Sequence, residues 1–223
     1  MSGLTAHELA DGARTTDCHL CGKIVRLRDM AAHLKHHEMD KATRSAPEIC
    51  RNANCGRTVH GAGPRGALRS GTAAGQGPGN DLGLCSLCFA PLYVSMHDPE
   101  GKALRRRIER RYLSQLMTGC GKSWCRNEWC RTGRANTGLD ALGSSAQAAL
   151  PLVKPLLADI SDCDRPLYFC VDESAQKRRI TANMMAAEMA WDLEWCIAAL
   201  EAEAGNVDRA REWLVNWAPT RHS

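Results

Sequence analysis

Phenylalanine and tyrosine are scarce in this chain of 223 residues, which holds two Phe and three Tyr beside twelve Cys. Small modules with so few aromatic side chains bury too little surface to fold alone, and disulfides or metal ions then stabilise them. The opening stretch MSGLTAHELADGARTT lacks a basic region followed by an apolar run, so secretion and disulfide formation are not indicated. We therefore expect zinc sites in a protein of a reducing compartment, the nucleus or the cytoplasm.

Long apolar runs are also missing. No stretch approaches the roughly 20 apolar residues that cross a bilayer, so we expect no membrane segment. The net charge of +4 is unevenly distributed, with 14 Lys and Arg against 5 Asp and Glu over residues 50–134, and 3 against 7 over residues 181–223. The basic segment favours contact with phosphates or an acidic protein, and it fits a solvated helix face equally well.

The first cysteines form a pattern typical of a zinc finger, which we predict over residues 14–42. Two residues separate Cys18 from Cys21, and His33 and His37 follow on one face of a short helix. Structural zinc takes four sulfur or nitrogen ligands in a tetrahedron, and these residues supply them, with His36 as the alternative to His37. We expect a small apolar core between the two pairs, made of Ile24, Val25, Leu27, Met30 and Leu34.

In spacing and in the segment CHLCGKIVRLRDMAAHLKHH, this finger resembles the ubiquitin-binding zinc fingers of translesion-polymerase and repair proteins. The resemblance implies that the helix contacts ubiquitin, but those fingers carry an acidic residue where this chain has Lys35. Protein docking or structural packing is the other interpretation. Reading of a DNA sequence is not indicated, because fingers of that kind come in tandem with a spacing of about twelve residues.

A second zinc unit is predicted over residues 48–92, with Cys50, Cys55, Cys85 and Cys88 as ligands and His60 as a possible replacement for one cysteine. Residues 61–83 between the two pairs are rich in glycine, which predicts a flexible insertion. Such an insertion is tolerated because the entropy cost of closing a loop grows slowly with its length. A RING arrangement does not fit, since a second interleaved ligand set with a histidine is missing.

A third unit is predicted over residues 100–173. Apolar residues recur at every fourth position, which predicts a helix that buries one face and ends at Gly119. These apolar residues are Leu104, Ile108, Tyr112 and Leu116. The remaining faces are basic, with Arg105, Arg106, Arg107, Arg110 and Arg111. Three further ligands follow, Cys120, Cys125 and Cys130. The apolar segment 146–160 predicts a second helix. We expect it to begin late, at Pro151 or Pro155, because proline fits the first helical turn.

The basic helix followed by GC-x4-C-x4-C resembles the AZUL domain, the amino-terminal zinc finger of a HECT-type ubiquitin ligase, over residues 102–173. The resemblance implies a helical zinc domain of the ubiquitin–proteasome system, with a proteasome subunit as one expected partner. In AZUL domains the fourth cysteine follows the second helix, and the matching residue here is Cys170. Cys163 is the alternative fourth ligand.

The tail, in the segment MAWDLEWCIAALEAEAGNVDRAREWLVNWAP, has apolar residues at helical spacing on both sides of a Gly-Asn turn, and Cys196 lies on the core side. Its order of motifs resembles the ubiquitin-associated (UBA) domain over residues 180–217, with Ile180–Glu188 as the first helix. The resemblance implies a three-helix bundle and a ubiquitin-binding patch of Met189, Ala190, Trp191, Leu214 and Val215. Similar bundles in elongation factor Ts and in nascent-chain-binding proteins make plain docking the alternative.

These patterns predict small zinc-stabilised modules, mainly α: a zinc finger, a zinc-knuckle module, a two-helix zinc domain and a three-helix bundle. Three structural zinc ions with four protein ligands each leave no open position for a substrate, so we expect no enzyme. The leading interpretation is a non-catalytic adaptor that binds ubiquitin or a ubiquitin-pathway protein. One alternative is a regulatory fragment of a ubiquitin ligase. The other is a nucleic-acid-binding factor, which is less favoured because the net charge is only +4 and no tandem fingers are seen in the sequence.

Overall fold

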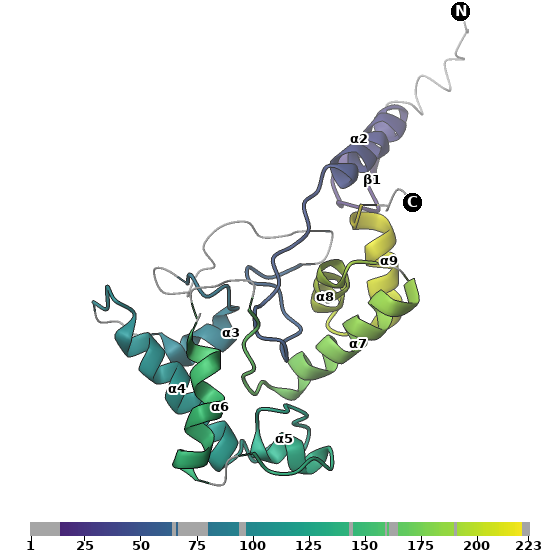
Figure 1. Ribbon diagram of the computed structural model, residues 1–223. Helices are drawn as coiled ribbons and strands as arrows, with labels where there is room; N and C mark the ends of the chain where they lie inside the picture. The colour runs from purple at the N-terminus through teal and green to yellow at the C-terminus, as the bar shows by residue number, and fades with distance from the viewer. Residues whose placement is uncertain are drawn as a thin grey trace, which may run out of the picture.

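The computed structural model describes residues 14–63, 66, 80–93, 97–142, 145–158, 160, 165–189 and 191–219. Helices dominate this part of the chain, and Figure 1 shows an N-terminal finger, a central helical unit and a C-terminal group of helices. The arrangement confirms the predicted fold class of small, mainly α modules that carry Cys and His clusters. Among the described residues, no helix combines the length and the apolar character that a membrane span requires.

The finger consists of a short hairpin followed by a helix. β1 (Thr15–Asp17) pairs antiparallel with β2 (Ile24–Arg26), and η1 (Leu27–Asp29) leads into α2 (Met30–Ala42). None of the residues of α2 is buried, and Ile24 and Leu27 are 73% and 46% exposed. The prediction that these two side chains fill a core was therefore wrong. Three-residue strands and one helix enclose little volume, so this fold depends on its metal ligands.

The central unit, residues 48–173, is built around a long helix. Its helices are α3 (Ser86–Phe89), η3 (Ala90–Leu92), α4 (Lys102–Met117), α5 (Arg131–Asn136) and α6 (Ala146–Ala158). The side chain of Asp98 caps α4, because its Oδ2 accepts hydrogen bonds of 2.9 and 3.0 Å from the backbone amides of Ala103 and Leu104. Gly119 follows the helix with a φ of 82°, which confirms the predicted end of α4.

The helix α6 begins before its two prolines, so the prediction of a late start was wrong. Pro151 and Pro155 both lie inside α6 and are exposed. Ala149, Val153 and Leu157 form the buried face and pack toward the core. The missing amide of each proline leaves a carbonyl of the preceding turn without its helical partner, and the exposed position of the prolines leaves those groups on the solvent side.

The two modules predicted for residues 48–92 and 100–173 share one hydrophobic core. Tyr112 and Phe169 lie at its centre with their ring centroids 5.2 Å apart. The two segments are also joined by backbone hydrogen bonds, since Leu167 accepts from the amide of Ala53 at 2.8 Å and donates to the carbonyl of Arg51 at 3.1 Å. Cys55, Leu84, Leu92, Ile108, Leu116, Val153 and Leu167 complete the best-buried part of this core.

The tail bundle consists of α7 (Glu173–Met189), α8 (Leu193–Ala202) and α9 (Val207–Trp217). Its first helix begins well before the predicted Ile180, directly after the central unit. As a result α7 contributes Ala175 to the core of the central unit and Met185 to the core of the tail bundle. Asn206 caps α9 by accepting a hydrogen bond of 3.1 Å from the amide of Arg209.

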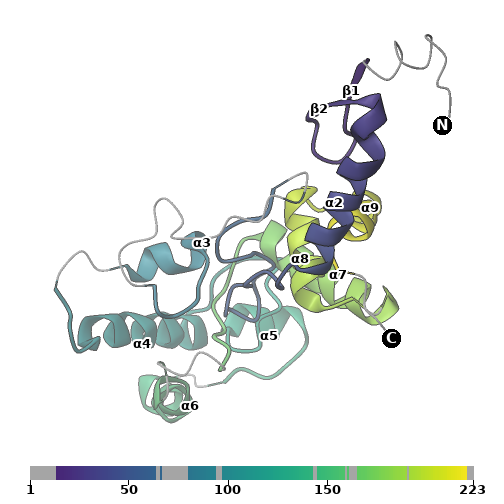
Figure 2. The ribbon, with the colours of Figure 1, turned by 90° about the horizontal axis from the view of Figure 1, so that it is seen from above.

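The finger packs against the last helix of the tail bundle. Figure 1 and Figure 2 both show α2 beside α9, so chain segments far apart in sequence meet there. The ring of His37 lies 6.0 Å from that of Trp217, and the guanidinium of Arg44 lies 5.1 Å from the centre of the Trp217 ring. Leu20 packs against the apolar core of the tail bundle. The finger therefore has a fixed docking partner within the same chain.

Candidate zinc centres and the surface of the tail bundle

Within the described residues, three clusters bring four cysteine or histidine ligand atoms within 4.8 Å of one another. We number them in chain order. Their members are Cys18, Cys21, His33 and His37 in site 1, Cys50, Cys55, Cys85 and Cys88 in site 2, and Cys120, Cys125, Cys130 and Cys170 in site 3. These are the residues that the sequence spacing and the AZUL resemblance indicated.

The geometry of the clusters fits zinc. Four sulfurs at about 2.3 Å from a zinc ion lie about 3.8 Å from one another. In site 2 the sulfurs of Cys55 and Cys85 are 3.9 Å apart, and in site 3 those of Cys125 and Cys170 are 3.8 Å apart. In site 1 the sulfur of Cys21 lies 3.3 Å from Nε2 of His33. Each donor set supplies four soft or borderline ligands, which is the chemistry of a closed structural zinc site.

Site 1 is held by the hairpin turn and one face of α2. Cys18 is buried, whereas Cys21, His33 and His37 are half-buried. The alternative ligand His36 points away, because its Nδ1 lies 3.0 Å from a carboxylate oxygen of Asp40. A helical spacing of four residues places His33 and His37 on one face, so the local sequence is enough to form this site.

Site 2 is fully buried. Cys85 is the N-cap residue directly before α3, and its backbone amide donates a hydrogen bond of 3.3 Å to the sulfur of Cys50. His60, the alternative ligand, lies outside the cluster and pairs with Glu48 at 3.2 Å. Most of the glycine-rich insertion at 61–83 lies outside the described residues. The two ligand pairs are thus far apart in sequence but meet inside one apolar core.

Site 3 is formed by the loop after α4 and by the segment before α7. Turn hydrogen bonds of 3.1 and 3.0 Å shape the loop, from the amide of Cys125 to the carbonyl of Lys122 and from the amide of Cys130 to the carbonyl of Asn127. Cys170 completes the cluster. The alternative, Cys163, lies outside the described residues.

Within site 2 and within site 3, the thiols change one another's pKa values. A hydrogen bond from Cys50 lowers the pKa of Cys85 far below that of an ordinary thiol, while its hydrogen bond with Cys50 raises the pKa of Cys55. In site 3, hydrogen bonds from Cys125 lower the pKa of Cys130 and raise that of Cys170. Four thiols within 4.8 Å of one another cannot all ionise without a compensating charge, and a divalent metal ion supplies that charge.

The sequence patterns did not single out three buried polar side chains of the central unit. Asn52, Asn127 and Gln115 are 0%, 2% and 5% exposed, and all three hydrogen bond around the zinc sites. Gln115 is the only one that a pattern marks, because it lies on the core-facing side of α4 beside Tyr112. A buried polar side chain needs specific partners, so a glutamine on an apolar stripe is a signal of such a role.

The predicted ubiquitin patch is only partly on the surface. Val215 is 60% exposed, whereas Leu214 is fully buried in the core of the tail bundle and cannot reach a partner. Met189 and Trp191 are half-buried and pack against the same core. Ala190 lies outside the described residues. Among the described residues of the predicted patch, Val215 is therefore the one that exposes most of its side chain.

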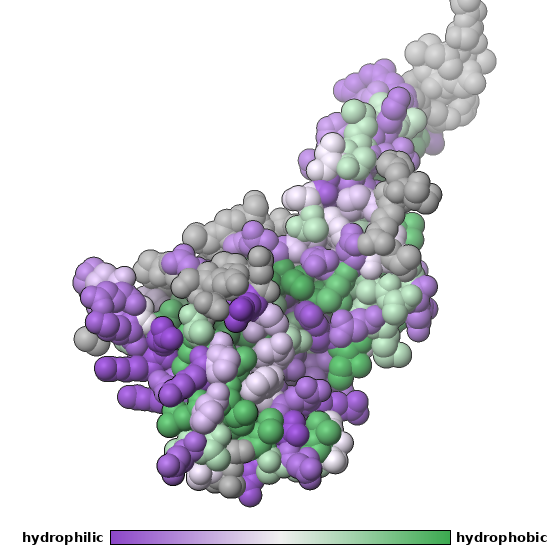
Figure 3. All heavy atoms as spheres, in the orientation of Figure 1, coloured by the Kyte–Doolittle hydropathy of each residue, from purple (hydrophilic) through white to green (hydrophobic). Residues whose placement is uncertain are grey.

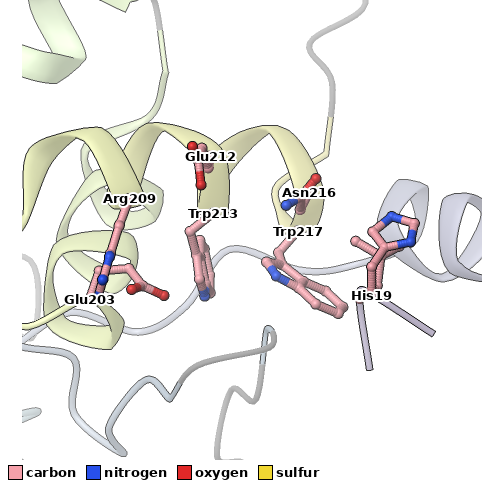
Figure 4. Close-up of a pocket in the computed structure, with 8 residues that line it drawn as sticks. His19, Glu203, Arg209, Glu212, Trp213, Asn216 and Trp217 are labelled. Carbon is pink, nitrogen blue, oxygen red and sulfur yellow. The ribbon is translucent and has the colours of Figure 1, made fainter. Parts of the chain in front are cut away.

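A pocket lies where the finger meets the tail bundle. Figure 4 shows the indole rings of Trp213 and Trp217 projecting from one side of α9, with His19 of the finger beside Trp217. Glu203 and Arg209 border the other end. The two indoles are almost completely buried, which indicates that they serve chiefly as packing surface between modules.

Comparison with protein families assigns one segment. Residues 105–155 match the AZUL family, described as an amino-terminal zinc-binding domain of a ubiquitin ligase. The match confirms the predicted AZUL resemblance for this segment, which contains most of α4, three ligands of site 3 and the first part of α6. The fourth ligand, Cys170, lies beyond it. The chain matches no curated protein and no solved structure.

Proposed function

We propose that this protein is a non-catalytic, zinc-stabilised adaptor of the ubiquitin system. The observation that carries the proposal is the match of residues 105–155 to the zinc-binding domain of a ubiquitin ligase, on a segment that supplies three of the four ligands of site 3. Each of the three sites has four protein ligands and leaves no position for water or substrate. Zinc here supports the fold, and recognition takes place on the surfaces that the fold exposes.

The partner we infer is ubiquitin, bound by the tail bundle. An ion pair of 3.7 Å between Arg211 and Glu188 ties α9 to the end of α7, so the loop after α7 lies close to α9. Val215 is one turn further along α9 and exposes its apolar side chain. A small patch of this kind barely exceeds the cost of association, so we expect a dissociation constant of about tens to hundreds of micromolar.

A nuclear magnetic resonance titration of isotope-labelled ubiquitin with the full chain tests this surface. Val215→Asp should abolish the chemical-shift changes, because it places a charge on the patch, while the fold persists because the side chain is exposed. Leu139→Asp is the matched control, since Leu139 is 43% exposed on the central unit. Absence of any shift with the wild-type chain at millimolar concentration would reject ubiquitin as the partner.

We assign the finger a docking role, in place of the ubiquitin contact that its spacing implied. Its helix carries exposed Lys35 where the resembling fingers carry an acidic residue. Near its end, α2 lies against the tail bundle: the Nζ of Lys41 donates a hydrogen bond to the carbonyl of Val215. The finger thereby supports the helix end on which the proposed patch lies.

The thiol ligands need a reducing environment, which supports a nuclear or cytoplasmic location.

A nucleic acid is the second candidate partner, because α4 exposes a basic face. Arg105, Arg106, Arg107 and Arg110 are exposed, and none of them takes part in an ion pair among the described residues. Figure 3 shows strongly hydrophilic side chains gathered on the surface around α4. Affinity for DNA and RNA measured across a salt series decides this candidate, since binding through phosphates falls steeply as salt rises. Binding that is weak and independent of salt would exclude it.

A further inference from the structure

The segment from Tyr168 to Cys170 lies between sites 2 and 3 and is held from both sides. On the side of site 2, Asn52 pairs with the backbone of Phe169 as a neighbouring strand would. Its Oδ1 accepts from the Phe169 amide at 3.0 Å, and its Nδ2 donates to the Phe169 carbonyl at 3.2 Å. The same Nδ2 donates to the sulfur of Cys88 at 3.4 Å. One buried amide thus joins this segment to a ligand of site 2.

Asn127 makes the matching contacts on the side of site 3. Its Nδ2 donates to the Tyr168 carbonyl at 2.9 Å and to the sulfur of Cys170 at 3.4 Å. Its Oδ1 accepts from the backbone amide of Trp129 at 2.9 Å. An amide nitrogen carries two hydrogens, so in both asparagines one hydrogen serves a backbone carbonyl and the other a ligand sulfur.

Arg111 connects the two sites directly. Its guanidinium donates to the carbonyl of Cys88 at 3.4 Å and to the carbonyl of Cys170 at 3.2 Å, and it lies 4.4 Å from the centre of the Phe169 ring. Gln115, one turn later on α4, donates to the Tyr168 carbonyl at 3.0 Å and accepts from the Cys170 amide at 2.8 Å. Both side chains of α4 therefore depend on the same ordered segment.

We propose that sites 2 and 3 bind zinc as one cooperative unit, with Asn52 and Asn127 as positioning residues for the thiolates of Cys88 and Cys170. Zinc at either site orders the shared segment, so the entropy cost of ordering it is met only once when both sites fill. An N–H donor aimed at a thiolate stabilises its negative charge and fixes the direction of its lone pairs. Linkage requires the coupling to be reciprocal, so each site raises the zinc affinity of the other by the same factor.

Site 1 is the internal reference for this proposal. Its ligands come from the finger alone, and Asn52, Asn127 and Arg111 make no contact with them among the interactions of the described residues. We therefore expect its zinc to leave independently of the other two.

The first experiment is stepwise chelation of the full chain followed by native mass spectrometry. To remove the signal of site 1, the chain carries Cys18→Ala and Cys21→Ala. Cooperative sites should release their zinc together, so that species with two zinc ions and with none are seen and the species with one is nearly absent. A substantial population with one zinc ion at intermediate chelator concentration would overturn the proposal.

The second experiment separates sulfur contacts from ordinary packing. Asn52→Leu and Asn127→Leu keep the approximate side-chain size but remove the donors, and loss of such outer contacts weakens metal binding by about 10–100-fold. Because the sites are coupled, each substitution should weaken zinc binding at both sites 2 and 3. With cobalt in place of zinc, the sulfur-to-cobalt absorption band should also shift, a signature that a merely structural role would not produce.

The chain offers a matched control for each asparagine. Asn54 donates to the Phe169 carbonyl at 3.3 Å, and Asn136 donates to the carbonyl of Cys125 at 2.9 Å, but within the described part of the chain neither bonds to a sulfur. Asn54→Leu and Asn136→Leu should leave the cobalt band in place and change zinc affinity less than their counterparts. Equal effects of Asn52→Leu and Asn54→Leu on band and affinity would show that the sulfur contacts do not matter.

Discussion

The finger and the central unit both carry cysteine-based zinc sites, but they use the metal in different ways. In the finger, Cys18 is buried while no residue of α2 is, and Ile24 lies in solvent. In the central unit, sites 2 and 3 adjoin a core that contains Tyr112 and Phe169. Metal binding substitutes for a core in the first case and joins chain segments around a core in the second. The tail bundle is the third case, a core with no metal site among its described residues.

Removal of zinc should have the largest effect on stability, and the effect should differ between the finger, the central unit and the tail bundle. Structural zinc contributes about 10–16 kcal/mol of apparent binding energy per site, which is folding energy where the ligands are. We expect a strong chelator to unfold the finger and the central unit and to leave α8 and α9 folded. Hydrogen exchange measured by mass spectrometry checks this. Full protection of α4 after chelation would contradict it.

Alkylation of cysteines gives an independent reading of the same experiment. Cys196 is fully buried in the tail bundle, and burial raises the pKa of its thiol to about 11, so at pH 8 it stays protonated and unreactive. After chelation the ten cysteine ligands should react while Cys196 does not. Rapid labelling of Cys196 would show that the tail bundle needs the central unit in order to fold.

Phe169→Ala should come next in size. The side chain is fully buried and lies against Tyr112 and the guanidinium of Arg111, so its loss leaves a cavity that costs about 3–5 kcal/mol. Ile24→Ala in the finger is the control, because removal of an exposed side chain changes stability by at most about 0.5 kcal/mol. Urea denaturation followed by circular dichroism measures both. Comparable losses of stability in the two variants would show that the finger and the central unit do not differ in how much they depend on a buried core.

Arg44→Ala should have the smallest effect. It removes the contact of the guanidinium with the Trp217 ring and a hydrogen bond of 3.3 Å to the carbonyl of Gly66, a cation–π loss of about 0.5–1 kcal/mol. We expect faster hydrogen exchange in α2 and unchanged zinc affinity at sites 2 and 3. Lys35→Ala, at an exposed position of the same helix, is the control. Identical exchange in the two variants would show that Arg44 does not hold the finger in place.

Local patterns were the most predictable part of this protein. The ligands of site 1 lie within one short segment, and a helical repeat of four residues brings His33 and His37 to one side. The same repeat predicted the buried face of α4, and Gly119 marked its end. Cys170 came only from a family resemblance, because spacing alone did not distinguish it from Cys163.

The wrong predictions applied a local sequence rule to residues whose environment is set by the tertiary structure. Pro151 and Pro155 were expected to start α6, yet both lie on its exposed face, where the disrupted hydrogen bonds do not face the core. Ile24 and Leu27 were expected to be buried because they are apolar, but a finger of this size has no interior to receive them.

The sequence by itself determined most of the candidate metal ligands, because thiolates and imidazoles at fixed spacing have few other uses and the ligand pairs are formed by short-range geometry, whereas the choice of Cys170 needed the family resemblance. It also determined the last two helices of the tail, whose apolar spacing is repeated over several turns, but not the start of α7. Only the tertiary structure decided that sites 2 and 3 share a core, that Asn52 and Asn127 face ligand sulfurs, and that the finger packs on α9. These contacts join residues far apart in sequence, and their partners are selected by burial and hydrogen bonding across the whole fold, which no local pattern encodes.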